Sequence, residues 1–159
     1  MPPKSPQIRV FDCHIARDTS EGFEFLLLKR AEGKIYSGDW RMVGGKIQDG
    51  EKAWEACQRE IQEETQLPVK RLLVVPYINS FYEWEEDRIN DIPVFVAETE
   101  PSAEPVLNDE HTEFIWIKPE PAREKLNWPG QREGLTAANA LLKLGHPLQP
   151  YLKVMASKG

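Results

Sequence analysis

Apolar and polar residues alternate along much of this chain in the way that predicts β-strands. Six segments show either this period of two or a short, continuous apolar run. They are Ile8–Arg17, Phe23–Lys29, Trp40–Val43, Arg71–Trp84, Ile92–Glu98 and Phe114–Lys118. Residues 85–91 are strongly charged and predict the turn of a hairpin, while Gly44-Gly45 is predicted to end the third strand.

Helices are predicted between and after these strands. The segment from Glu51 to Gln66 lacks Gly and Pro, is rich in Glu, Ala and Gln, and is followed by Pro68. Shorter helices are predicted for Pro119–Leu126 and Arg132–Leu144, the second with apolar residues at helical spacing. This order of elements indicates an α/β protein with a mixed central sheet and helices on both faces.

The length and composition favour one domain. The chain has 159 residues, and we expect residues 1–7, which are rich in proline, to form a flexible tail before a single domain at 8–159. No apolar run approaches the roughly 20 residues that span a bilayer, and no secretion signal is evident. Cys13 and Cys57 form no CxxC pair and indicate reduced thiols. We therefore expect a cytoplasmic protein without a membrane partner.

The formal net charge is −6, which argues against a nucleic-acid duplex as the main partner. An acidic protein that binds an anionic phosphate substrate needs divalent cations between the two. The charge therefore favours a metal site mildly, although it is equally explained by solubility.

The chemistry of the chain is concentrated on the predicted helix at 51–66. Each helical residue advances by about 100°, so Glu60, Glu63 and Glu64 are predicted to project into one arc of about 100°. Such crowded carboxylates repel one another unless Arg59 and a hard cation such as Mg²⁺ offset their charge. For the three glutamates alone, a solvated acidic face is the alternative; the preceding Gly44-Gly45 loop favours a ligand site.

Residues 45–67 resemble the Nudix box, G-x5-E-x7-R-E-U-x-E-E-x-G-U, in which U is a bulky aliphatic residue. Eight of the nine fixed positions match. They are Gly45, Glu51, Arg59, Glu60, Ile61, Glu63, Glu64 and Leu67. The exception is Gln66, which stands where the pattern has a glycine in the turn after the helix.

This resemblance implies a Nudix-type α/β/α sandwich and a set of roles. Glutamates matching Glu60 and Glu64 bind Mg²⁺ or Mn²⁺ in the family, and the one matching Glu63 often assists. The backbone carbonyl matching Gly44 commonly adds a ligand. The pair matching Arg59 and Glu51 is usually structural, as is the box glycine Gly45.

Three segments outside the box resemble the dihydroneopterin triphosphate pyrophosphohydrolases, which also accept deoxynucleoside triphosphates. These segments are residues 38–45, residues 109–116 and residues 127–135. The resemblance implies that Glu110 is a further metal ligand or general base, and we expect His111 to orient its loop. A surface carboxylate is the alternative for Glu110.

Candidates for substrate binding lie before the box. Arg30 and Arg41 have the chemistry to bind phosphates, and Trp40 could stack on a base or pterin ring, as could Tyr82 and Trp84. Strand aromatics are more often part of a core, and charges at strand ends are often simply solvated.

The sequence therefore predicts a metal-dependent pyrophosphohydrolase that converts a nucleoside or dihydroneopterin triphosphate into a monophosphate and pyrophosphate. One alternative is a hydrolase of dinucleoside polyphosphates or nucleotide sugars. Another is a catalytically inactive Nudix module that only binds nucleotides. The sequence gives no indication of the oligomeric state.

Overall fold

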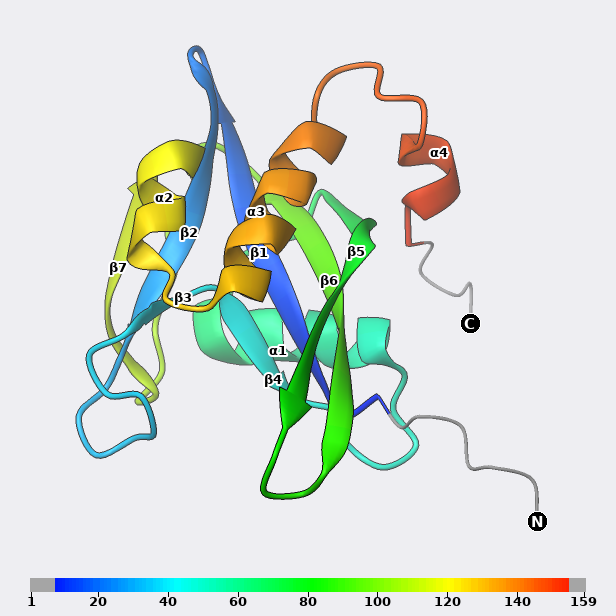
Figure 1. The fold of residues 1–159 in the computed structure, drawn as a ribbon. Helices are drawn as coiled ribbons and strands as arrows, with labels where there is room; N and C mark the ends of the chain where they lie inside the picture. Colours follow the sequence, from blue (N-terminus) through cyan, green and yellow to red (C-terminus); the bar gives the residue numbers. More distant parts are fainter. Residues whose placement is uncertain (1–7, 155–159) are drawn as a thin grey trace.

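A seven-stranded mixed sheet lies at the centre of the molecule, with helices on both faces (Figure 1). The computed structural model describes residues 8–154; the predicted tail at residues 1–7 lies outside the described residues. The strands are β1 (Val10–Thr19), β2 (Gly22–Arg30), β3 (Trp40–Arg41), β4 (Val43–Lys46), β5 (Arg71–Glu83), β6 (Arg88–Thr99) and β7 (His111–Ile117). Their order is β3-β2-β1-β6-β5, with β4 paired to β1 and β7 paired to β2.

The sheet is mixed because β1 pairs with β6 in parallel, whereas the other pairs of strands are antiparallel. The helices are α1 (Ala53–Thr65), α2 (Pro119–Lys125), α3 (Pro129–Leu141) and α4 (Gln149–Leu152). Among the described residues, no helix is long and apolar enough to cross a membrane. The predicted mixed sheet flanked by helices is confirmed.

Strand β1 divides the core in two, because successive side chains of a strand point to opposite faces. Its residues Phe11, Cys13 and Ile15 pack in the cluster that includes Ile61 of α1. Ala16 packs on the opposite face, in the cluster that α2 and α3 line. The same alternation directs two polar residues, at positions 12 and 14, toward the α3 face.

Three element boundaries differ from the sequence prediction. Gly44 and Gly45 do not end a strand but lie inside β4, where they pair with Asp12 and Phe11 of β1. The hairpin turn is shorter than the charged segment at 85–91, because β6 already pairs from Arg88 with β5. Helix α3 begins at Pro129, because proline is tolerated at the first position of a helix.

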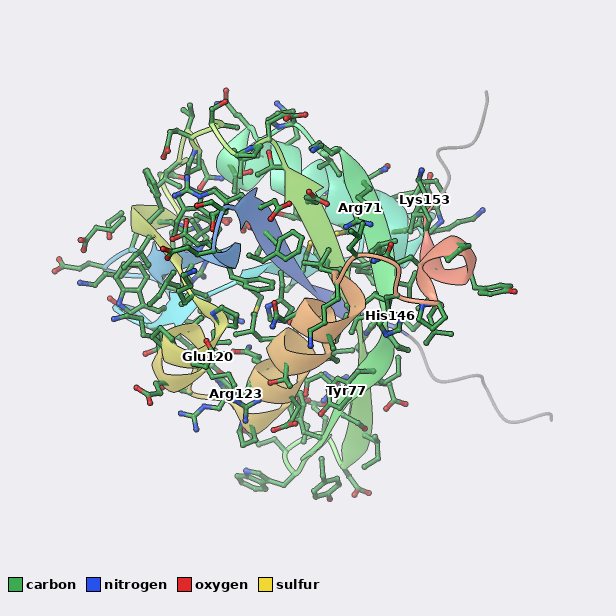
Figure 2. All side chains as sticks on the ribbon, turned by 90° about the horizontal axis from the view of Figure 1, so that it is seen from above. Arg71, Tyr77, Glu120, Arg123, His146 and Lys153 are labelled. Carbon is green, nitrogen blue, oxygen red and sulfur yellow. The ribbon has the colours of Figure 1, made fainter. Side chains whose placement is uncertain are left out.

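The short helix α4 was not predicted from the sequence, and side-chain contacts hold it against β5. Arg71 donates to Glu98 Oε1 at 2.7 Å and to Gln149 Oε1 at 3.1 Å, while Leu73 forms a β-bridge with Lys153. Figure 2 shows Arg71 and Lys153 beside this helix. Four residues are too few for a periodic pattern, so tertiary contacts alone define the helix.

Helix α1 keeps the geometry of a glycine-capped helix without the glycine. Gln66 has φ 56° and ψ 18°, in the left-handed region. Its backbone N–H donates to the carbonyl oxygens of Gln62 and Ile61 at 3.1 and 3.2 Å. The departure from the Nudix box therefore leaves the cap intact, at the cost of placing a side chain in a strained conformation.

We predict that Gln66→Gly stabilises the protein by about 0.5–1 kcal/mol. Relief of the left-handed strain exceeds the extra backbone entropy of glycine in the unfolded chain. Urea denaturation measures the change. The matched control is Gln62→Gly, an exposed position inside α1, which we expect to destabilise by about 1 kcal/mol. Equal destabilisation by both variants would contradict the strained cap.

Candidate active site

The three box glutamates on α1 do not share one environment. Glu64 is buried at 3% exposure, and the Glu60 side chain is 15% exposed, whereas that of Glu63 is 54% exposed. The prediction that all three project into one enclosed arc is therefore wrong for Glu63. Its position on the wheel lies farthest toward the solvent edge, where it forms an i,i+4 ion pair with Arg59.

Arg59 organises the acidic residues around it. Its guanidinium donates to Glu51 Oε2 at 2.8 Å, to Glu60 Oε1 at 2.8 Å and to Glu63 Oε2 at 3.2 Å. It also donates to the backbone carbonyl of Lys46 at 3.1 Å, which ties α1 to the end of β4. The hydrogen bonds from Arg59 lower the pKa of Glu51. One cation thus fixes the orientation of three carboxylates.

The two glycines of β4 allow this strand to lie close to its neighbours. A Cβ on Gly45 would lie 2.9 Å from Cδ of Glu60, and one on Gly44 would lie 3.0 Å from the carbonyl oxygen of Phe11. Real Cβ atoms rarely approach so closely. Because Glu60 is already held by Arg59, any side chain at Gly45 would displace its carboxylate.

A second group of ligand atoms lies next to Glu64. Oxygen or nitrogen atoms of Glu64, Glu110 and His111 lie within 4.8 Å of one another. Glu64 Oε2 and His111 Nδ1 are buried and have no hydrogen-bond partner among the described residues. A buried carboxylate oxygen without a donor is unfavourable, so this group has the composition of a cation site that lacks its cation charge.

Electrostatics lead to the same conclusion. Burial raises the pKa of Glu64 to about 10, and the hydrogen bond and charge of Glu110 and the charge of Glu60 add to this effect. Burial also raises the pKa of Glu60, although its ion pair with Arg59 opposes the change. Burial lowers the pKa of His111 to about 4, so the imidazole is neutral and able to act as a ligand.

Glu110 reaches this group because its loop is fastened to α1 and β2. Asn108 Oδ1 accepts from the backbone N–H of Glu110 at 3.0 Å, and Asn108 Nδ2 donates to the carbonyl of Glu63 at 3.2 Å. The Glu110 carbonyl accepts from the N–H of Ala31 at 2.9 Å. Asn108 was missed in the sequence, where the signal was an Asn two residues before the candidate carboxylate.

The three substrate-binding candidates separate in the structure. Arg30 lies at the acidic group, with Nη1 4.0 Å from Glu110 Oε2. Arg41 has its guanidinium 5.6 Å from the ring centroid of Tyr36. Trp40 instead packs against the core on the α2 and α3 face, where Lys125 lies 5.4 Å from its ring centroid. This ring is therefore committed to packing.

The other two aromatic candidates lie on the β5–β6 hairpin. Tyr82 is 56% exposed and Trp84 is 76% exposed. Tyr82 donates its hydroxyl hydrogen bond to Asp87 at 2.6 Å, across the turn.

The Nudix domain family model matches residues 7–138, which is most of the chain. The chain belongs to the Nudix family. The box, the sheet order and the acidic group described above all lie within the matched residues. Members of the family generally use a divalent metal ion, and the carboxylates beside Glu64 are ligands of the kind such an ion takes.

Two curated relatives show how distant the known proteins are. An octanoyltransferase of Myxococcus xanthus is 28% identical over 137 residues, covering 85% of this chain. This chain spans only 38% of the length of that relative. The nucleoside triphosphatase NudI of Salmonella typhimurium is 27% identical over 104 residues, covering 60% of this chain and 74% of NudI.

Solved structures share the fold. A Nudix hydrolase of Listeria monocytogenes has a TM-score of 0.74 at 22% identity, covering 94% of this chain and all of that one. The Ap4A hydrolase of Caenorhabditis elegans reaches 0.70 at 20% identity, covering 86% and 98%. The dihydroneopterin triphosphate pyrophosphohydrolase of Escherichia coli reaches 0.66 at 20% identity, covering 82% and 94%. These likenesses establish the Nudix fold.

The raised pKa of Glu64 predicts how the metal-free protein responds to pH. The folded state holds this proton more tightly than the unfolded state, so its contribution to stability is complete below about pH 4.5 and is lost as the pH rises toward 10. Glu64→Gln removes this loss. We expect the variant to exceed the parent by about 1–2 kcal/mol at pH 8.5 in a chelator, and to equal it near pH 4.5.

Thermal unfolding at both pH values measures this difference, with Glu124→Gln, an exposed glutamate on α2, as the matched control. Addition of Mg²⁺ is expected to raise the melting temperature of the parent and of the control but not of Glu64→Gln. A parent that is most stable at high pH without metal would contradict the buried, crowded carboxylate.

Proposed function

We propose that this protein hydrolyses a phosphoanhydride bond of a nucleoside or dihydroneopterin triphosphate, releasing a monophosphate and pyrophosphate, with Mg²⁺ as its cofactor. Mn²⁺ can replace Mg²⁺ in this proposal. The observation that carries it is the buried, unpartnered Oε2 atom of Glu64 within reach of Glu110 and His111. Such an arrangement is costly without a cation and favourable with one.

The residues present fit a hard divalent ion. Glu60, Glu64 and Glu110 would hold it through carboxylate oxygens, with the Gly44 carbonyl and Glu63 as further contributors at the rim. When bound, such an ion neutralises the phosphate charge and polarises the phosphoryl group. Arg59 keeps Glu60 in position whether or not the ion is present, because their ion pair is 2.8 Å long.

The chain's own residues supply the remaining functions. Arg30 and Arg41 are placed to bind phosphate oxygens, since Arg30 lies beside Glu110 and the charge of Arg41 acts on His111. In the proposed reaction a water oxygen bonds to the α-phosphorus and its proton passes to a carboxylate, for which Glu110 is the candidate base. The bond between the α-phosphorus and the bridging oxygen breaks, and pyrophosphate leaves.

Support from relatives is graded. NudI carries the name nucleoside triphosphatase and shares the larger part of its length with this chain. The pyrophosphohydrolase and Ap4A hydrolase structures are both below 25% identity and support the fold alone. Both described cysteines are buried free thiols, which supports the proposed cytoplasmic location.

The test is hydrolysis of a substrate panel by the purified protein with Mg²⁺. The panel holds dihydroneopterin triphosphate, the four deoxynucleoside triphosphates, diadenosine tetraphosphate and a nucleotide sugar, and pyrophosphate and orthophosphate are measured separately. We expect pyrophosphate from the triphosphates. Glu64→Gln and Glu110→Gln should each lower kcat by about a hundredfold or more, because they remove a ligand or the base.

Glu124→Gln is the matched control and should retain full activity. Activity confined to the dinucleotide or the sugar would replace the proposed substrate class. If no substrate turns over while Mg²⁺ and a nucleotide still bind, the protein is a binding module and the hydrolase proposal fails.

A further inference from the structure

A layer of polar side chains lies buried between the sheet and α3, outside the acidic group. Its members are Asp12 and His14 on β1, Asn79 on β5 and Gln131 on α3. Asp12 is 5% exposed, Asn79 7% and Gln131 6%. Polar groups placed so deeply cost stability unless they are paired or reserved for a ligand.

The pairing within this layer is incomplete. Asn79 Nδ2 donates to Asp12 Oδ2 at 3.0 Å, which accounts for one carboxylate oxygen. Asp12 Oδ1 accepts no hydrogen bond from the described residues. Gln131 Oε1 is fully buried and also has no partner among them. Two acceptor oxygens therefore lack donors.

Helix α3 brings these two acceptors to the same end of the sheet. Its buried residues Gln131 and Gly134 lie one turn apart on the side facing the sheet. A Cβ on Gly134 would contact His14 and Val94, and Val94 is the register partner of Asp12. Gln131 thus lies one turn further toward the N-terminus of α3, where Gly130 packs on the Asn79 side chain.

Exposed aromatic rings surround the solvent side of this layer. Trp128 lies with its ring centroid 6.1 Å from that of Tyr36 and 5.9 Å from that of Phe81. Their exposures are 41%, 45% and 36%, which is unusual for three rings in mutual contact. Tyr36 also has φ 61°, a strained conformation for an aromatic residue and one that often marks a functional position.

Arg41 connects this layer to the acidic group. Its guanidinium lies over the Tyr36 ring, and its charge acts on both Asp12 and His111. Burial raises the pKa of Asp12, while the Asn79 hydrogen bond and Arg41 oppose that change and favour the carboxylate. A substrate with phosphates at the acidic group and Arg41 would extend its ring toward the aromatic residues.

We propose that Asp12 and Gln131 select a 2-amino-4-oxo pyrimidine edge, the edge that guanine and pterin rings share. The inference rests on the proposed function and defines the substrate class of that same site. The aromatic rings would stack on the faces of the bicyclic ring, and the two free acceptors would receive its ring N–H and its amino group.

The donor pattern of the bases decides between them. An ionised carboxylate and an amide oxygen are both acceptors, so the site requires two adjacent donors on the ligand. Guanine and pterin present a ring N–H beside an amino group. Adenine and cytosine present one amino group beside a ring acceptor, and thymine presents one N–H between two carbonyls. Only the shared edge satisfies both free oxygens.

The experiment compares kcat/KM for dGTP, dITP and dATP. The hypoxanthine of dITP differs from guanine only by lacking the 2-amino group. We expect dGTP to exceed dITP by about tenfold and dATP by more, since an unpaired buried acceptor is costly. Asp12→Asn is expected to lower kcat/KM for dGTP at least tenfold while leaving that for dATP unchanged or raised.

Two variants guard against a trivial result. Asp91→Asn, an exposed carboxylate on the hairpin, makes the same chemical change and should leave the ranking unaltered. Gln131→Leu removes the second acceptor and should narrow the dGTP to dITP ratio even if Asp12→Asn is poorly folded. Melting temperatures are measured for every variant.

Dihydroneopterin triphosphate distinguishes the two sources of the shared edge. If it exceeds dGTP, the pterin is the preferred ligand; if dGTP exceeds it, guanine is, and either ranking supports the inference. Equal kcat/KM for dGTP, dITP and dATP would overturn the inference while leaving the hydrolase proposal intact. Absence of hydrolysis of all triphosphates would overturn the proposed function itself, and the inference with it.

Discussion

The crowding of negative charge around Glu64 is the constraint on which the rest of the site depends. Its carboxylate is removed from water and lies beside two others, which raises its pKa to about 10. Neighbouring elements make this crowding tolerable. Arg59 holds Glu60 in a fixed direction, and the bare backbone of Gly45 leaves room for it. Asn108 fastens the Glu110 loop to α1, so the repulsion cannot relax by moving that loop outward.

Much of this could be predicted from the sequence, because it depends on local periodicity and on spacing within one segment. The helix at 51–66, the pairing of Arg59 with its acidic neighbours and the mixed sheet all follow from such patterns. The prediction was wrong where the outcome depended on tertiary pairing. Gly44 and Gly45 belong to a strand because β1 supplies partners for them, and no local signal distinguishes this from a turn.

Residues far apart in the sequence were harder to assign. Wheel geometry predicted one arc for three glutamates, but only contact with the sheet determines which part of that arc is buried, and Glu63 lies outside it. Asp12 and Gln131 are 119 positions apart, and their meeting depends on how α3 crosses the sheet. Trp40 shows the same limit, since its role in packing is fixed by α2.

Strand β1 presents Phe11 and Cys13 to the catalytic helix, and Asp12 and His14 to the opposite layer. One rigid strand therefore carries two independent sets of side chains. Mutations at its even-numbered positions would alter which ring is accepted, while the odd-numbered positions continue to hold the acidic residues in place. This separation gives evolution a means to change substrate preference in small steps, without passing through inactive intermediates.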